Sequence, residues 1–398
     1  MRRTAATAVA AAGAVLLLAA CGVTGRPVAQ PPPALSTPHP SAIGAPATVA
    51  PPTRTTTKTT TTTRKPAPPA AATLPEAGNP NGHATVPAAG RPVDTSHPTH
   101  VVGHGTPASC TSAAFVAAVA AGGIITFSCG PAPVTITLTT TAKVRNASSQ
   151  VVIDGGDEVT LSGAGSHRIL YQDTCDQAQG WATSHCDNQS TPHLTVQNLT
   201  FTGGNSTGAR EEGGGGGAIL DRGGRLTVVN DRFTHNRCDS GGPDLGGAAI
   251  RALSQYNGDP VYIVDSTFTD GVCSNGGGLS SIGVSWVVLN TLMTGNEAIG
   301  HGANPAASGT PGGGSGGAIY TDGDTYTVRI DGTVIEDNEA NEGGGAVFYV
   351  SNDKTGTMTV ESSTLRHNPS DSFETAGFPG IFFLGAHPPT VTSSTLSK

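Results

Sequence analysis

Two short motifs alternate along the second half of the chain, and they restrict its fold more than any other feature. The first motif is Gly-Gly-Ala followed by an aliphatic residue, with copies at 216–219, 246–250, 317–319 and 344–347 and a weaker copy at 277–279. The second is an apolar residue followed three positions later by asparagine, as in Phe233/Asn236, Met293/Asn296, Ile335/Asn338 and Leu365/Asn368. Repeats about 25 to 42 residues apart predict a solenoid in which each repeat forms one coil.

The residues between the motifs favour β-structure in these coils. Runs rich in Val, Ile and Thr at 124–127, 134–138, 151–154 and 159–161 are bounded by Gly, Pro or Asp, with no helical pattern between them. The chain holds 55 glycines, which excludes a helical bundle. A β-propeller is a weaker alternative, because its blades need four substantial strands every ~40 residues. We therefore predict an all-β protein, a right-handed parallel β-helix.

A capping helix is expected where the folded body begins. Thr111 or Ser112 can cap its start, Phe115, Val116 and Val119 give an apolar stripe, and glycines at 122–123 end it. All 18 aromatic residues lie beyond residue 100, so we place the β-helix domain at 101–398.

The spacing of the cysteines gives an independent test of how equivalent positions align in adjacent coils. Cys238 and Cys273 each lie five residues after a phenylalanine, Phe233 and Phe268. Coils stacked ~4.8 Å apart would bring these cysteines inside the ~4.4–6.8 Å Cα window of a disulfide. Cys110 with Cys129 and Cys175 with Cys186 are expected to pair because they are close in sequence; six cysteines allow 15 pairings.

The N-terminus reads as an export signal. Arg2 and Arg3 precede an apolar stretch at 5–18 that is too short to span a bilayer stably. Leu18-Ala19-Ala20-Cys21 resembles the lipobox of bacterial lipoproteins. The resemblance implies a signal peptide at 1–20, removed on export, and fatty acylation of Cys21 with chains such as palmitate. We expect a protein anchored by lipid to the bacterial cell membrane, extracytoplasmic and exposed at the surface.

Residues 21–100 are dominated by Pro, Ala and Thr and contain no aromatic residue. Such a stretch cannot bury enough apolar area to offset its ordering entropy. We therefore predict a disordered linker between the lipidated Cys21 and the β-helix.

Over about 110–396, the alternating motifs resemble the repeats of polymorphic outer-membrane proteins, within the pectate-lyase-like β-helix superfamily. That superfamily includes lyases, hydrolases, epimerases and adhesins, so the resemblance implies a fold and leaves the activity open.

Complete catalytic motifs are missing, and we assign no catalytic residue. Asn290-Thr291-Leu292 and Gly300-His301-Gly302 are fragments of polygalacturonase motifs, but the carboxylates that hydrolysis needs are absent. A lyase would need an arginine base and carboxylates that hold Ca²⁺, which makes Ca²⁺ a candidate cofactor. Residues near the ends of the repeated strands define one candidate binding face: Arg210, Glu211, Glu212, Asp221, Tyr320, Asp322 and Asp324.

Binding is the favoured function. Sugars pack on aromatic faces, and about half of the six Tyr and Trp residues in the repeats are expected to point into the core: Tyr256, Tyr262, Trp286, Tyr320, Tyr326 and Tyr349. Residues 101–398 hold 13 Lys or Arg against 27 Asp or Glu, which argues against a nucleic-acid partner. We expect a monomeric surface lipoprotein that binds extracellular or envelope glycan or mediates adhesion. A carbohydrate-active enzyme and a non-catalytic structural protein are the alternatives.

Overall fold

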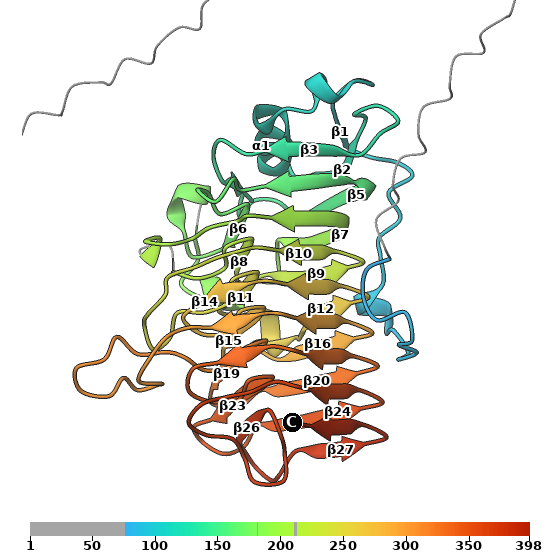
Figure 1. Ribbon diagram of the computed structural model, residues 1–398. Coiled ribbons are helices and arrows are strands. Elements are labelled where there is room, and N and C mark those ends of the chain that lie inside the picture. The colour runs from blue at the N-terminus through green and yellow to red at the C-terminus, as the bar shows by residue number, and fades with distance from the viewer. Residues whose placement is uncertain (1–75, 181, 211–212) are drawn as a thin grey trace, which may run out of the picture. The chain divides into compact units, whose positions relative to one another are not determined.

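The computed structural model describes residues 76–398 apart from 181 and 211–212, and these residues belong to one compact unit (Figure 1). The predicted signal peptide, Cys21 and residues 22–75 of the predicted linker lie outside the described residues. Within the described part, none of the helices has the length and apolar character needed to cross a membrane.

The described chain forms a parallel β-helix, which confirms the predicted fold class. Every paired strand in its three sheets runs parallel to its neighbour, and successive coils stack along one axis (Figure 1). Sheet A contains β1 (His100–Val102), β2 (Gly123–Phe127), β3 (Val134–Thr137), β5 (Gln150–Ser162), β7 (His193–Thr202), β9 (Arg225–Val229), β10 (Arg232–Thr234), β12 (Val261–Val264), β13 (Thr267–Thr269), β16 (Trp286–Leu289), β17 (Leu292–Thr294), β20 (Thr327–Asp331), β21 (Val334–Glu336), β24 (Thr357–Glu361), β25 (Thr364–Arg366), β27 (Thr390–Thr392) and β28 (Thr395–Ser397).

The other two sheets complete each coil. Sheet B contains β4 (Ala142–Lys143), β6 (Leu170–Asp173), β8 (Ile219–Arg222), β11 (Ile250–Ala252), β15 (Leu279–Ile282), β19 (Ile319–Gly323), β23 (Val347–Ser351) and β26 (Ile381–Leu384). Sheet C contains β14 (Val272–Cys273), β18 (Glu297–Ala298) and β22 (Glu339–Ala340). The predicted strands at 151–154 and 159–161 are one strand, β5, with a bulge between Asp154 and Val159.

Both sequence motifs form ladders in the core. The aliphatic residue of the first motif stacks from coil to coil in sheet B, as in Ile219, Ile250, Leu279 and Ile319. The phenylalanines of the second motif stack in sheet A, with ring centroids 4.8 Å apart for Phe201 and Phe233 and 4.7 Å apart for Phe233 and Phe268. Ladders of this kind bury apolar area continuously along the axis.

The asparagine of the second motif satisfies buried backbone groups at one corner of each coil. Asn338 donates through Nδ2 to Met293 O, 3.0 Å away, and accepts through Oδ1 from the backbone N–H of Asn296. Asn368 repeats this arrangement one coil later. Burying a backbone N–H or C=O group without a hydrogen bond costs free energy. These asparagines therefore stabilise a corner where regular backbone hydrogen bonding between strands is interrupted.

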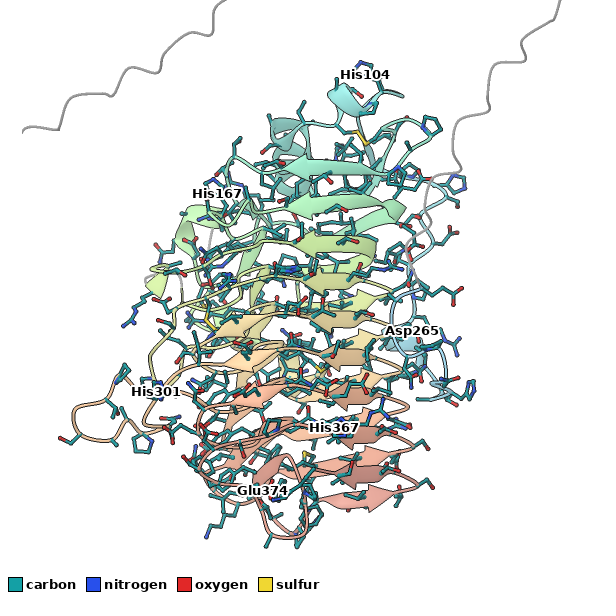
Figure 2. The ribbon with its side chains drawn as sticks, viewed as in Figure 1. His104, His167, Asp265, His301, His367 and Glu374 are labelled. Atoms are coloured by element: carbon teal, nitrogen blue, oxygen red, sulfur yellow. A yellow bond between two sulfur atoms is a disulfide. The ribbon has the colours of Figure 1, made fainter. Side chains whose placement is uncertain are left out.

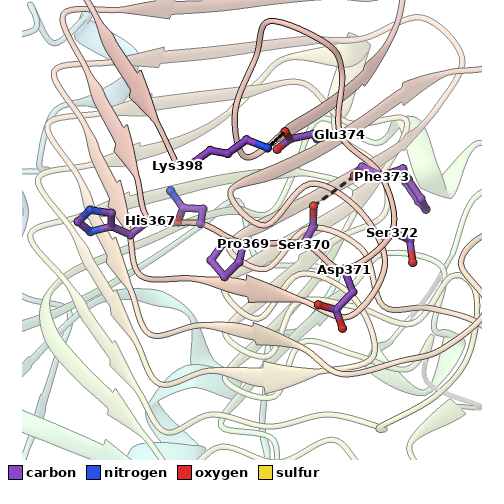
Figure 3. A pocket seen from close by; sticks show the side chains of 9 residues that line it. His367, Pro369, Ser370, Asp371, Ser372, Phe373, Glu374 and Lys398 are labelled. Carbon is purple, nitrogen blue, oxygen red and sulfur yellow. Dashed lines mark hydrogen bonds and ion pairs between the residues drawn. The ribbon is translucent and has the colours of Figure 1, made fainter.

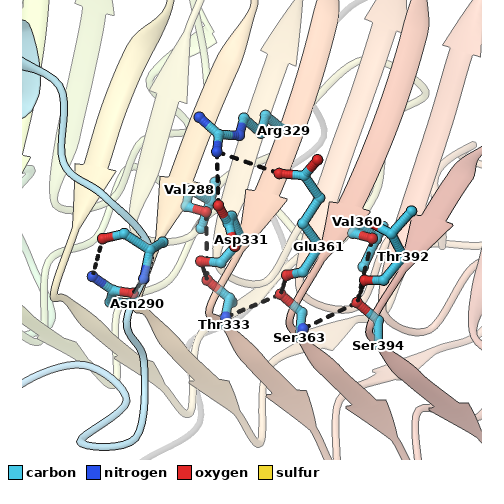
Figure 4. A network of polar contacts seen from close by, with 11 residues as sticks. Val288, Asn290, Arg329, Asp331, Thr333, Val360, Glu361, Ser363, Thr392 and Ser394 are labelled. Carbon is cyan, nitrogen blue, oxygen red and sulfur yellow. Dashed lines mark hydrogen bonds and ion pairs between the residues drawn. The ribbon is translucent and has the colours of Figure 1, made fainter.

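Hydroxyl groups have a similar role at the preceding corner of each coil, such as the one between β20 and β21 (Figure 4). Thr333 Oγ1 donates to Asp331 O and accepts from Thr291 N, and Ser363 and Ser394 repeat the pattern. On the outer surface of the same coils, Arg329 forms ion pairs with Asp331 and Glu361.

The capping helix is confirmed as α1 (Ser112–Ala121). Thr111 Oγ1 accepts from Ala114 N at 3.2 Å, and Gly122 ends the helix with a φ of +77°. Phe115 and Val119 are fully buried against the first coils. Single-turn 3₁₀ helices in the described part of the chain include η1 (Ala88–Gly90), η2 (Pro107–Ser109), η3 (Gln177–Gln179), η4 (Cys186–Asn188) and η6 (Tyr256–Gly258).

All three predicted disulfides are present. Cys238 and Cys273 link adjacent coils with a Cα–Cα distance of 4.8 Å, inside the predicted window. The Cα atoms of Cys110 and Cys129 are 5.7 Å apart, and those of Cys175 and Cys186 are 4.9 Å apart.

The predicted linker boundary at residue 100 is wrong. Residues 78–97, which we call the strap, lie along the outer face of sheet A (blue in Figure 1). Ala84 and Val86 cover an apolar stripe formed by Val229, Val264 and Leu289. Backbone hydrogen bonds to side chains of the sheet fix the strap, and composition alone carries no signal of such contacts.

Candidate functional site

Two residues of the predicted face, Tyr320 and Asp322, do lie together. Both point outward from β19, where a loop at 300–317 covers them. Asn304 of this loop donates through Nδ2 to Tyr320 Oη at 2.9 Å and to Asp322 Oδ2 at 2.6 Å, and also contacts Asp244 Oδ1 at 2.7 Å. Burial, followed by the Asp322 charge, raises the pKa of Tyr320 well above its usual value. The polar groups here already satisfy one another, so the cluster fastens a loop.

Asp221 does not belong to that face, which corrects the sequence prediction. In the register of sheet B, Asp221 stacks with Ala252, Ser281 and Thr321, whose side chains alternate with that of Tyr320. It is fully buried and accepts hydrogen bonds from Gln172 Nε2 at 2.8 Å and from Gln255 Nε2. Burial raises the pKa of Asp221 well above its usual value.

The remaining predicted residues are scattered. Arg210 is exposed and lies 3.6 Å from Asp239, and Asp324 is exposed beyond the end of β19. Glu211 and Glu212 lie outside the described residues. Arg251, the other arginine near the repeated strands, is 4% exposed and makes no ion pair within the described part. Among the described residues of the predicted face, neither Arg210 nor Arg251 is paired with two carboxylates.

The described residues also hold no group of three or more His, Cys, Asp or Glu side chains that could bind a metal ion. The two hydrolase-like fragments have structural roles. Asn290 binds the strap at Ala84, and His301 lies at the base of the loop that extends from the body, 3.3 Å from Asn341 (Figure 2).

Three of the six aromatic residues in the repeats, Trp286, Tyr326 and Tyr349, belong to the core, as expected. Tyr320 is buried beneath the loop at 300–317. Tyr256 and Tyr262 are half-buried and both lie near Arg225, Tyr262 in β12 on the outer face of sheet A and Tyr256 in η6.

A cleft of about 140 Å³ lies there, where β7, β9 and β12 begin and the strap crosses them. Its polar lining comes from His193, Arg225 and Asp259, and its apolar lining includes the Tyr262 ring. The strap forms one wall through Ala89. A Cβ at neighbouring Gly90 would lie 3.1 Å from Tyr262 Cδ1, so glycine allows the strap to approach the ring closely.

The charges in this cleft are neutralised and held in place. Arg225 Nε donates to Asp259 Oδ2 at 2.9 Å, and its guanidinium lies 4.7 Å from the centre of the Tyr256 ring. Burial, and then the Arg225 charge, lowers the pKa of His193, so its imidazole is neutral at neutral pH.

Several polar groups in the cleft remain available. Within the described part of the chain, the Tyr262 hydroxyl, Asp259 Oδ1 and His193 Nδ1 form no hydrogen bond. Acceptors and donors therefore surround an aromatic face, which is the arrangement that orients a small polar ring.

A larger cleft of about 370 Å³ lies at the last coils (Figure 3). Lys398 reaches Glu374 at 2.7 Å, whereas His367 pairs with Asp337 at 3.4 Å. His367 and Asp371 lie on opposite sides of this cleft (Figure 3). Because its charged groups do not converge, we favour the smaller cleft as the candidate site.

Sequence reasoning singled out Tyr256 and Tyr262 and missed His193, Arg225 and Asp259. The last two lie 34 residues apart in neighbouring coils. Only the loop lengths between the coils decide that pairing, and the sequence motifs do not fix those lengths.

No protein-family model, curated protein or solved structure matches this chain.

Proposed function

We propose that this protein binds glycan outside the cell, through the cleft of His193, Arg225, Asp259 and Tyr262. The observation that carries the proposal is the Tyr262 ring beside a neutralised Arg225–Asp259 pair, in a cleft with free donors and acceptors. Sugars present apolar ring faces and hydroxyl groups, and both features have counterparts here. The cleft is small compared with the roughly 300–1,000 Å³ of pockets that enclose drug-sized ligands, so it suits one sugar ring.

The proposed setting follows from the N-terminal sequence. The lipobox-like Leu18–Cys21 segment would anchor the protein to the bacterial cell membrane through acylated Cys21. The Pro/Thr/Ala-rich stretch that follows would hold the β-helix away from the lipid, exposed at the cell surface. The repeats support membership of the pectate-lyase-like superfamily, in the branch with polymorphic outer-membrane protein repeats, and that superfamily includes adhesins as well as enzymes.

The proposal is tested with an array of neutral and uronate oligosaccharides and with purified envelope polysaccharide. Tyr262→Ala should weaken binding of the best array ligand about tenfold, as loss of a central aromatic contact does. Asp259→Asn should weaken it as well, because one acceptor is lost and Arg225 is freed. Thr359→Ala, on the outer face of the same sheet three coils beyond Tyr262, is the matched control.

Equal binding by wild type and Tyr262→Ala would show that the cleft is not the site. Absence of any glycan binding by the full protein would favour the structural role instead. Release of unsaturated sugar ends during incubation would establish a lyase and would contradict a purely binding function.

A further inference from the structure

Arg251 is a buried cation with no counter-charge among the described residues. It points outward from β11 in sheet B, yet loops cover it so that only 4% of the residue is exposed. Its Nε and Nη1 atoms have no hydrogen-bond partner, and it forms no ion pair with the described residues. Leaving a buried charge uncompensated costs several kcal/mol, so a stable fold needs a group that supplies this charge.

A second unsatisfied donor lies beside it. Ser280 is the register partner of Arg251 on the next coil, and its buried Oγ also has no hydrogen-bond partner. Adjacent parallel strands lie about 5 Å apart, so Ser280 and Arg251 project from the same face of sheet B on neighbouring coils. Both groups can donate hydrogen bonds, and an anion between them could accept from both.

Two glycine-rich loops press directly on these side chains. A Cβ at Gly215 would lie 2.8 Å from Arg251 Cδ, and a Cβ at Gly246 would lie 2.5 Å from Ser280 Oγ. Gly215 has a φ of +65°, in a run of left-handed residues at 213–216 that glycine alone adopts without strain. These close contacts, together with the burial of Arg251, favour a small ion over a larger ligand at this position.

Arg251 carries its positive charge in this environment. Burial lowers the pKa of Arg251 to about 10, and the Tyr320 and Asp244 charges oppose that shift. The guanidinium is therefore charged at neutral pH. Asp244 is exposed and lies beyond ion-pair distance from it.

We propose that Arg251 and Ser280 form an internal binding site for a small inorganic anion of halide size. The anion would accept hydrogen bonds from Arg251 Nε and Nη1 and from Ser280 Oγ, and would supply the missing counter-charge. This site lies on sheet B and does not depend on the glycan cleft on sheet A.

The test is thermal unfolding of the full chain in sodium chloride, sodium bromide and sodium gluconate at equal ionic strength. A ligand that binds only the folded state raises the midpoint with its concentration, so wild type should gain several degrees in chloride or bromide over gluconate. Arg251→Met should lose this difference, and Ser280→Ala should reduce it. Arg329→Met, which removes an arginine from the outer face of sheet A, should keep it.

The comparison between variants makes the test decisive. If water alone solvates Arg251, Arg251→Met is more stable than wild type in every salt, because replacing an unpaired buried charge by a packed side chain is stabilising. That result, or equal midpoints for wild type in all three salts, would overturn the proposal. A bromide anomalous peak within hydrogen-bond distance of Arg251 Nε in crystals would confirm it directly.

Discussion

Gln197 holds Val93 through both of its backbone polar groups. Gln197 Oε1 accepts from Val93 N at 2.8 Å, and Gln197 Nε2 donates to Val93 O at 3.0 Å. Asn290 binds Ala84 in the same two-point manner further along the strap. Each side-chain amide thus forms the two backbone hydrogen bonds that a residue of a neighbouring strand could otherwise form. These bonds hold a segment with few apolar side chains on the sheet.

Gln197→Glu should detach residues 90–97 of the strap from sheet A at neutral pH. A carboxylate cannot donate to Val93 O, and it would lie beside Asp154, which now accepts from Gln197 Nε2 at 2.9 Å. Burial alone would raise the pKa of Asp154, but hydrogen bonds from Thr95, Asn198, Gly156 and Gln197 together lower it, so it is ionised at pH 7. We expect faster hydrogen exchange over 90–97 at pH 7 and recovery near pH 4, where the new glutamate is protonated.

Gln177→Glu, an exposed change of the same charge, serves as the control for this experiment. Unchanged exchange in Gln197→Glu at pH 7 would show that the amide clamp does not hold the strap.

Asp231→Ser should stabilise the protein at neutral pH. Asp231 belongs to an earlier coil of the hydroxyl ladder whose later members appear in Figure 4, since its N–H donates to Ser266 Oγ at 3.2 Å. Ser266, Thr291 and the later members each donate to the carbonyl two residues earlier, which an ionised carboxylate cannot do. Burial raises the pKa of Asp231 well above its usual value, and Asp231 Oδ2 has no hydrogen-bond partner.

The sign of this effect depends on pH. A carboxyl group whose pKa is raised in the folded state binds more protons there than when unfolded, so it destabilises as pH rises above about 4. Asp231→Ser should gain about 1–3 kcal/mol in urea unfolding at pH 7, the cost of an unsatisfied buried polar group, and gain less at pH 4. A loss of stability at pH 7 would contradict this account.

The core ladders could be predicted from the sequence because stacking depends only on equivalent positions within each coil. Phe233, Phe268 and the cysteines five residues beyond them share one offset, so one register fixes them all. The same argument from offsets explains why the prediction that Asp221 belongs to the binding face was wrong. Asp221 follows Ile219 by two residues and Asp322 follows Ile319 by three, and side chains alternate between the two faces of a strand.

The strap and the cleft could not have been predicted in the same way. The strap binds through its own backbone groups, which every sequence carries, and composition therefore classed it with the linker. The cleft needs Asp259 and Arg225 at the starts of β12 and β9, and loops of variable length set that alignment.

His193 should make the stability of the fold fall in mild acid. Its pKa is lowered, first by burial and then by Arg225, so the unfolded chain binds a proton at a higher pH than the folded one. The stabilising contribution is complete above about pH 6.5 and is lost as pH falls through the lower folded value. His193→Gln should show a smaller drop between pH 7.5 and pH 5 in urea unfolding than wild type. His387→Gln, an exposed histidine, should behave as wild type.

Removing the disulfide between adjacent coils should cost more than removing a local one. Cys238 and Cys273 close a loop with a sequence separation of 35, compared with 11 for Cys175 and Cys186. Constraint of the unfolded chain grows with loop length, and a disulfide typically contributes about 2–4 kcal/mol. The Cys238→Ala/Cys273→Ala double variant should therefore lose more stability in urea unfolding than Cys175→Ala/Cys186→Ala. Cys238 and Cys273 are buried whereas Cys175 and Cys186 are half-buried, so packing adds to the effect of the longer loop, and equal losses in the two variants would contradict this prediction.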